Sequence, residues 1–193
     1  MTRKLKQIDE LERNVHRLAG AETGKIVMEG REKVTASSSP LKIARWVKGA
    51  MERLDRLVDN ETRIRIMENC GYNCALVNKS VMQRAKTRRK KHKTVDEFLE
   101  SEQRKPSAGM RMTRERGVIY QFYIPSSFSR PMRCYCSLLR GLPSKESVSA
   151  TYCHCGKAFA QRYWENILER PVKVDLLQSC VSGAKECKFA IQF

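Results

Sequence analysis

Eight cysteines are the residues of this chain whose type and spacing could do chemistry, and six of them lie in its last third. These six form two C-x-C pairs and two single positions: Cys134, Cys136, Cys153, Cys155, Cys180 and Cys187. Side chains alternate between the faces of a strand, so a C-x-C pair in a strand would place both sulfurs on one face. Two such pairs side by side would offer four thiolates to a soft metal ion. We therefore expect these cysteines to bind Zn²⁺, with an iron–sulfur cluster as the alternative.

The same cysteines have other uses, which the residues leave open. Free cysteines often pack in a core as small hydrophobic residues, and a disulfide or redox role is the third interpretation. His154 stands between Cys153 and Cys155, where strand alternation would turn it away from both sulfurs. We therefore rank His154 below the cysteines as a metal ligand.

Cys70 and Cys74 form a C-x-x-x-C pair around Gly71. If a helix ran through the pair, both sulfurs would share one face. We interpret the pair as a second thiol site, either a half-site or a redox pair, and packing beneath the sheet is the alternative. The pair could also approach the C-x-C cysteines and share their metal.

The charge of the chain indicates an acidic partner or an anionic ligand. Its formal net charge is +17, from 38 Lys and Arg against 21 Asp and Glu. The run KTRRKKHK at 86–93 supplies the candidate anion or nucleic-acid contacts Arg88, Arg89, Lys90 and Lys91. No aromatic residues interleave this run, so nucleic-acid binding is predicted to be weak and nonspecific.

The composition also bears on location. No apolar run is long enough to span a membrane, and the first 18 residues are charged throughout, without an apolar signal core. We therefore expect a cytoplasmic protein, in which thiols stay reduced.

Hydrophobic periodicity predicts an α+β fold, with a helical N-terminal half followed by an antiparallel sheet that has helices packed on one face. Three regions are expected: a helical extension or linker at 1–39, a helical region at 40–114 and an α+β domain at 115–193. The predicted helices lie at 3–18, 41–58, 61–69, 94–102 and 156–169. The predicted strands lie at 117–125, 133–139, 149–155, 171–183 and 186–193, and Gly71 is expected to end a helix.

Aromatic residues of the last third could line a pocket for a small hydrophobic or aromatic ligand. The candidates are Tyr120, Phe122, Phe159, Tyr163 and Trp164. The alternative is that these side chains form the core of the domain.

The last third resembles the 4-vinyl-reductase domain, over roughly residues 115–193. The matching pieces are Cys155-Gly156-Lys157-Ala158-Phe159, Arg170-Pro171-Val172-Lys173-Val174, Ser179-Cys180, Gly183 and Glu186-Cys187-Lys188-Phe189-Ala190-Ile191. The resemblance implies an α+β domain that binds a small molecule, like the zinc-bearing sensor modules of aromatic-responsive regulators and a reductase component of the chlorophyll pathway. The element RIMENCGYNC, from Arg65 to Cys74, is similar to that of a cysteine-rich prokaryotic family whose function is uncharacterised.

The resemblance also implies a set of zinc ligands. In the sensor branch they fall on Cys155 or Cys153, on position 177, and on Cys180 and Cys187. Position 177 is a leucine here, so the carboxylate ligand of that family is missing. Cys153, Cys134 or Cys136 would then supply the fourth ligand.

We derive three hypotheses of function from these features. The first is a cytosolic zinc-binding domain that binds a small molecule or acts as a sensor, with a helical half that dimerises or relays the ligand state to a partner. The second is an enzyme that uses a cysteine nucleophile or an iron–sulfur cluster; a related hydrolase family that acts on aminothiazoline carboxylates has a similar C-terminal shape. The third is a nucleic-acid-associated protein that uses its basic helical region.

Overall fold

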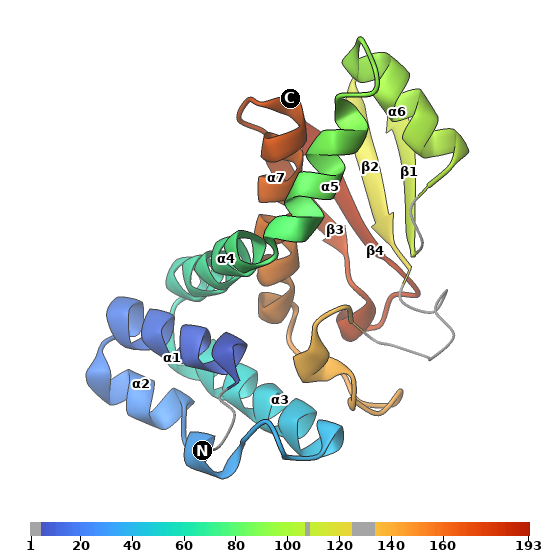
Figure 1. Ribbon diagram of the computed structural model, residues 1–193. Helices are drawn as coiled ribbons and strands as arrows, with labels where there is room; N and C mark the ends of the chain where they lie inside the picture. Colours follow the sequence, from blue (N-terminus) through green and yellow to red (C-terminus); the bar gives the residue numbers. More distant parts are fainter. Residues whose placement is uncertain (1–4, 107–108, 125–133) are drawn as a thin grey trace.

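The computed structural model describes residues 5–106, 109–124 and 134–193 (Figure 1). Its first half contains α1 (Lys6–Ala19), α2 (Ala21–Val27), the 3₁₀ helix η1 (Arg31–Lys33), α3 (Pro40–Leu57), α4 (Asn60–Val77), α5 (Lys79–Arg89) and α6 (Val95–Arg104). Its second half contains β1 (Met110–Glu115), β2 (Val118–Tyr123), the 3₁₀ helices η3 (Ser137–Leu139) and η4 (Ala150–Cys153), α7 (His154–Leu168), β3 (Lys173–Gln178), the 3₁₀ helix η5 (Cys180–Ser182) and β4 (Cys187–Gln192). This order confirms the predicted α+β fold.

The strands form one antiparallel sheet in the order β1-β2-β4-β3. The predicted strands that became β2, β3 and β4 are confirmed, whereas β1 was not predicted because MRMTRE lacks alternating apolar residues. A two-residue turn joins β1 to β2, with φ of 47° at Arg116 and 81° at Gly117. Positive φ at both positions is typical of the tight hairpin turns that match the twist of a sheet.

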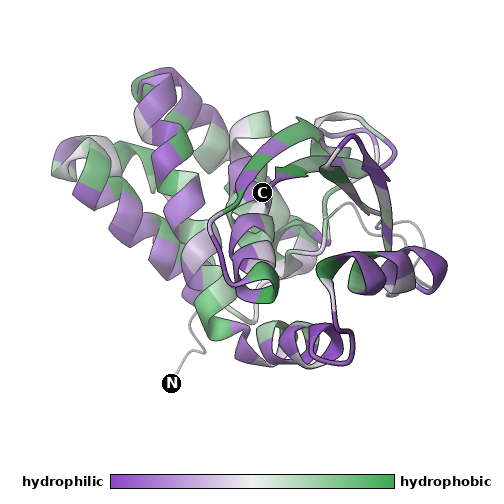
Figure 2. Cartoon of the chain, turned by 90° about the horizontal axis from the view of Figure 1, so that it is seen from above, coloured by the Kyte–Doolittle hydropathy of each residue, from purple (hydrophilic) through white to green (hydrophobic). Residues whose placement is uncertain are grey.

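Helices cover one face of this sheet, as predicted. Phe98 and Leu99 of α6 and Trp164 of α7 share a buried cluster with Ile119 and Ile191 of the sheet. Seen from above, the sheet carries many hydrophobic residues, whereas the outer helices are largely hydrophilic (Figure 2).

The helices α1, α2 and α3 form a layer whose apolar core also contains residues of α4, η3, η4 and η5. Figure 1 shows this layer at one end of the molecule and the sheet with α5, α6 and α7 at the other, with α4 between them. Within the described residues, no helix is both long enough and apolar enough to cross a membrane.

The predicted helix end at Gly71 is wrong, because α4 continues to Val77. A Cβ at Gly71 would lie 2.2 Å from the carbonyl oxygen of Cys155 and 2.9 Å from the Cβ of Ala158. Because glycine has no side chain, the backbone of α4 at Gly71 can lie directly against α7. Gly71 does not serve as a helix cap. Because α4 runs through the pair, Cys70 and Cys74 lie one turn apart.

The predicted strands at 133–139 and 149–155 are also wrong. In the described part of the first, the chain is irregular and then forms η3, where the adjacent residues Leu138 and Leu139 are both buried. In the second, the hydroxyl of Ser149 accepts a hydrogen bond from the backbone N–H of Thr151 and η4 leads into α7. The C-x-C pairs thus lie in turns and at a helix start, not in strands.

Candidate functional site

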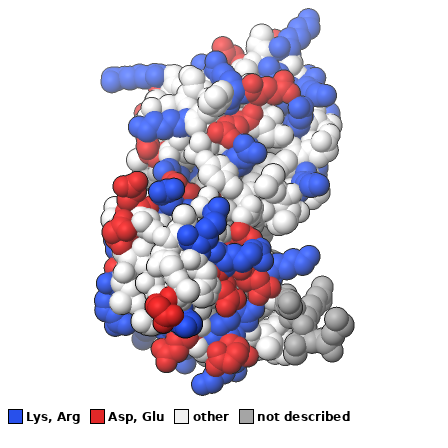
Figure 3. All heavy atoms as spheres, turned by 90° about the vertical axis from the view of Figure 1, so that its left-hand side faces the viewer, with Lys and Arg blue, Asp and Glu red and all other residues white. Residues whose placement is uncertain are grey.

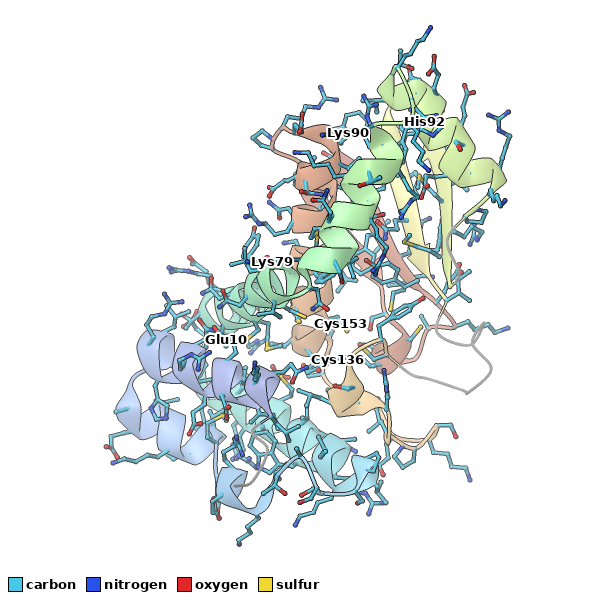
Figure 4. All side chains as sticks on the ribbon, viewed as in Figure 1. Glu10, Lys79, Lys90, His92, Cys136 and Cys153 are labelled. Atoms are coloured by element: carbon cyan, nitrogen blue, oxygen red, sulfur yellow. The ribbon has the colours of Figure 1, made fainter. Side chains whose placement is uncertain are left out.

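All eight cysteines lie where the helical layer meets the end of the sheet, and all eight are free thiols. They come from α4, from the segment before η3, from the junction of η4 with α7, and from η5 and the start of β4. Figure 4 labels Cys136 and Cys153 close together in this region. We describe the eight cysteines in two groups of four.

The first set, which we call the sheet-end thiols, consists of Cys134, Cys153, Cys180 and Cys187. The backbone N–H of Cys180 donates a hydrogen bond to the sulfur of Cys187 at 3.4 Å. The sulfur of Cys153 lies 2.7 Å from the hydroxyl oxygen of Ser179, the residue before Cys180. The sulfur of Cys134 accepts a hydrogen bond from the backbone N–H of Cys136 at 3.4 Å.

The sheet-end thiols influence one another's pKa values. The pKa of Cys187 is lowered to about 7, mainly by a hydrogen bond with the Cys180 side chain. Burial opposes this shift, and the hydrogen bond from the Cys180 backbone N–H adds to it. The pKa of Cys153 is raised to about 11 by burial, opposed by the hydrogen bond with Ser179 and supported by the charge of Cys187. Burial also raises the pKa of Cys134, with further increases from the charges of Cys136, Cys153 and Cys187.

The second set, which we call the helix-junction thiols, consists of Cys70, Cys74, Cys136 and Cys155. Burial raises the pKa of Cys155 well above its usual value, and the charges of Cys136, Cys70 and Cys74 raise it further. Burial likewise raises the pKa of Cys74, and the next contribution comes from Cys136. The pKa of Cys70 rises to about 12, mainly through burial.

The structure separates the two cysteines of the second C-x-C pair, whereas Cys134 and Cys136 of the first pair stay in contact through a hydrogen bond from the Cys136 backbone N–H to the Cys134 sulfur. Cys153 lies beside Cys180 and Cys187, whereas Cys155 faces α4, as the close contact at Gly71 shows. Leu177 stands at a β-bulge with 52% of its surface exposed. The Nδ1 atom of His154 has no hydrogen-bond partner among the described residues, and no cysteine influences its pKa, which burial lowers.

The thiols are near one another but are not in coordination geometry. Within the described ranges 5–106, 109–124 and 134–193, no three His, Cys, Asp or Glu side chains are arranged as a metal site. Rotation about a cysteine Cα–Cβ bond between staggered positions moves the sulfur by about 3 Å. Side-chain rotation is therefore the change that a shared metal would require.

Several polar groups that contact the sulfurs were not predicted. The Asn14 amide donates to Cys70 at 3.7 Å, the Asn78 amide to Cys74 at 3.5 Å, and the Tyr152 hydroxyl to Cys136 at 3.1 Å. Asn14 is 2% exposed and interrupts the apolar stripe of α1, which is the one signal that the sequence offers for these contacts.

The candidate residues of the predicted aromatic pocket lie on both faces of the sheet. Trp164 donates a hydrogen bond to Gln121 on the helix-covered face of the sheet. Tyr120 and Phe122 alternate with Gln121 and face the other side, where the Lys188 ammonium lies 4.5 Å and 5.4 Å from their ring centres. Two surface hollows of about 660 and 440 Å³, beside α1 and α5, include none of the five aromatic residues.

The basic run divides into internal and exposed residues. Arg88 donates to both carboxylate oxygens of Glu102, at 3.0 and 3.4 Å, and to the Tyr163 hydroxyl at 2.9 Å. Arg89 donates to the carbonyl oxygen of His92 at 2.8 Å. Lys90, at the far end of α5 from Lys79 in Figure 4, is exposed, as is Lys91.

Acidic side chains interrupt the basic surface. On the face that Figure 3 shows, Asp and Glu are interspersed among Lys and Arg over both halves of the molecule. Of the four predicted anion or nucleic-acid contacts, Lys90 and Lys91 are the exposed ones, whereas Arg88 is engaged by Glu102 and Tyr163.

Comparison with known proteins shows the family and the fold. Residues 1–193 match the model of a family of unknown function (DUF6144), so the chain belongs to that family. No curated protein matches it. The chain is similar to the crystal structure of an H-NOX protein from S. oneidensis in the Fe(II)NO ligation state, with 12% identity, 98% of each chain covered and a TM-score of 0.51. An NMR structure of a mutant H-NOX domain from Shewanella oneidensis in the Fe(II)CO ligation state gives 12% identity, covers 100% of this chain and 98% of that one, and has a TM-score of 0.48.

These matches bear on the resemblance to the 4-vinyl-reductase domain. The first H-NOX structure shares the fold of the whole chain, not only of its last third. The narrower assignment to the 4-vinyl-reductase domain stays a prediction.

Proposed function

We propose that this member of the DUF6144 family is a zinc-thiolate domain of the sensory type, in which the sheet-end thiols bind Zn²⁺. The observation that carries the proposal is the backbone N–H of Cys180 donating to the sulfur of Cys187, with Cys153 beside the same turn. Such donors stabilise a thiolate, which is the form that binds metal. Cys134 completes the four thiol ligands that structural zinc prefers.

The metal would act as a structural link. From residue 134 to Cys153, regular structure is limited to η3 and η4 among the described residues. Cys134 and Cys153 stand at the two ends of this segment, and Cys180 and Cys187 stand at the end of the sheet. A zinc ion shared by all four would connect the segment to the sheet, and its binding energy would add to the stability of the fold.

A sensory role is supported by the fold alone. The H-NOX structure that shares the fold was determined in the Fe(II)NO ligation state, so this architecture carries a small ligand in that protein. Fold similarity does not define a ligand here, and we retain a small hydrophobic or aromatic molecule as the expected class. A thermal-shift screen of small aromatic compounds tests this class: a saturable rise in the melting temperature supports it, and no shift from any compound contradicts it.

The zinc site itself is tested by metal analysis. The full chain, purified anaerobically with a reductant, should contain zinc and absorb no visible light, because zinc is colourless. Replacing Cys180 and Cys187 together by serine should remove the zinc bound by the sheet-end thiols. Visible absorption that accompanies iron would favour the iron–sulfur alternative, and a metal-free protein would overturn the proposal.

Two further expectations belong to this proposal. A cytoplasmic location would keep the eight thiols reduced and able to bind metal. The helical half is expected to form a homodimer or to contact a partner, which light scattering of the purified chain tests: the mass of one chain would contradict the homodimer.

A further inference from the structure

The turn between α5 and α6 carries exposed lysines that the zinc site does not use. Lys90, Lys91 and Lys93 are all exposed and lie close together along the chain. Figure 4 shows Lys90 and His92 at the end of α5 that is remote from the labelled cysteines. We propose that this turn, residues 90–93, which we call the lysine turn, binds the phosphate backbone of duplex nucleic acid without sequence preference. This inference goes beyond the proposed function and does not depend on zinc.

The backbone of the lysine turn is held in place by contacts within the chain. The N–H of His92 donates a hydrogen bond to the carbonyl oxygen of Arg89 at 3.2 Å, and the Arg89 guanidinium donates to the carbonyl oxygen of His92 at 2.8 Å. The His92 ring packs edge-on against Phe98, with the ring centroids 5.8 Å apart. A backbone held in this way presents the lysine side chains in constant positions, so less conformational entropy is lost when they bind.

The carboxylates of the elements around this turn are engaged by other groups. Four of them have the following partners: Glu102 pairs with Arg88, Glu169 with Lys86, Asp96 with Arg114, and Glu97 with the backbone N–H of Lys93. Within residues 5–106, 109–124 and 134–193, no Asp or Glu forms an ion pair with the ammonium groups of the lysine turn. Three positive charges therefore stand together without a carboxylate partner from these residues, and an external polyanion would neutralise them.

Stabilisation of the neighbouring helices does not account for these lysines. A cation stabilises the C-terminus of a helix only within the last turn, and α5 ends at Arg89. Lys91 lies beyond that turn. Lys93 immediately precedes Thr94, the N-cap of α6, where a positive charge is unfavourable. A partner outside the chain explains both lysines, whereas the stability of α5 and α6 does not.

The chemistry of the turn favours duplex nucleic acid over other polyanions. Lysine ammonium groups act as point charges that contact phosphates without a fixed geometry, and a DNA duplex offers one phosphate charge per about 1.7 Å of its axis. No Phe, Trp or Tyr lies in the run 86–93, so the base stacking that holds single strands is not supplied. The large hydrophobic side chains that are exposed in the described part of the chain all lie outside this run. A basic cluster without an apolar anchor does not attach a protein stably to a membrane.

Binding of a fluorescein-labelled DNA duplex to the full chain, measured by anisotropy over a series of salt concentrations, tests the proposal. Each phosphate contact contributes about −0.9 to the slope of log affinity against log salt concentration. The Lys90→Ala/Lys91→Ala/Lys93→Ala variant should therefore have a slope that is shallower by about 2.7. At about 50 mM salt it should bind the duplex at least about 10-fold more weakly than the wild type. A duplex of unrelated sequence should give the same result.

The matched control removes the same charge from the other end of the molecule. Lys6, Lys33 and Lys42 are exposed and belong to α1, η1 and α3. The variant with alanine at these three positions should bind the duplex within about twofold of the wild type. An equal loss in the two variants would show that net charge governs binding and would overturn the assigned site. A wild type that does not bind the duplex at low salt would also overturn it.

Competition identifies the class of partner. Phosphatidylserine vesicles or polyglutamate that displace the duplex from the wild type, by binding more tightly at the same salt concentration, would contradict a nucleic-acid partner. Duplex binding that persists in their presence supports it.

A measurement on the wild type covers the case in which the triple variant does not fold. Lysines are acetylated with and without the duplex, and the modified positions are mapped by peptide mass spectrometry. Protection of Lys90, Lys91 and Lys93 by the duplex supports the proposal, and protection that leaves these three out overturns it. None of these measurements involves zinc, so their failure would leave the zinc-thiolate proposal standing.

Discussion

Replacing Gly71 by alanine tests how closely α4 and α7 pack. The new Cβ would lie 2.2 Å from the carbonyl oxygen of Cys155, a backbone atom that cannot move without the helix. Overpacking of this kind costs about 1–3 kcal/mol, and alanine gains about 1 kcal/mol over glycine in a helix. Because the contact is far shorter than van der Waals distance, we take the upper end and expect a net loss of about 2 kcal/mol.

Urea unfolding, followed by circular dichroism with a chelator and a reductant present, measures this loss without a contribution from metal. Gly49→Ala in α3 is the matched control, because its Cβ would meet no backbone atom and only the guanidinium group of Arg53, at 3.2 Å. That variant should gain up to about 1 kcal/mol from helix propensity. A Gly71→Ala protein as stable as the Gly49→Ala protein would refute the close contact between α4 and α7.

Three further predictions concern contacts away from the thiols. Arg88→Ala should lower the free energy of unfolding in urea by about 2 kcal/mol, because it leaves the buried Glu102 carboxylate unpaired. The partial exposure of Arg88 keeps this loss moderate. The control variant Lys90→Ala should change the free energy of unfolding by no more than about 0.5 kcal/mol. Equal effects of these two variants would contradict the internal role of Arg88. Trp164→Phe should cost about 1–3 kcal/mol because it removes the donor to buried Gln121, and adding Gln121→Leu should recover part of the loss; no recovery would argue against that hydrogen bond. Burial raises the pKa of Glu10, but hydrogen bonds from Arg13, Asn73 and Asn14 lower it below its usual 4.5. The charged carboxylate therefore stabilises the folded state above pH 4.5. This contribution is lost as the pH falls through the folded-state pKa. The stability difference between wild type and Glu10→Gln should therefore shrink between pH 6 and about pH 3.5, and a constant difference would show that Glu10 does not contribute in this way.

The fold could be predicted largely from local patterns. The alternating β-branched and aromatic residues of β2 and β4 indicate strands. The Thr94 hydroxyl caps α6 by accepting a hydrogen bond from the backbone N–H of Glu97 at 3.1 Å, and threonine is a usual residue at that position. The strand β1 was missed because its pairing with β2 depends on a turn, not on an apolar pattern of its own.

The grouping of the thiols could not be predicted in the same way. Two features, the C-x-C spacing and the expected reducing location, indicated thiolate chemistry, but the pairs were placed in strands because alternation was the only local model for them. The separation of Cys155 from Cys153 depends on the crossing of α4 and α7 at Gly71, which joins residues 84 positions apart. Hydrogen bonds from Asn14 and Tyr152 to the sulfurs are equally long-range and leave little trace in sequence.

X-ray absorption at the zinc edge of the purified, zinc-loaded chain tests the central claim most directly. Thiolate sites should give a shell of four sulfur ligands at about 2.3 Å, with no nitrogen or oxygen ligands. The same spectrum should revert to hydrated zinc after alkylation of the metal-free protein. A shell of nitrogen and oxygen atoms at about 2.0–2.2 Å in the untreated protein would contradict a metal held by the sheet-end thiols.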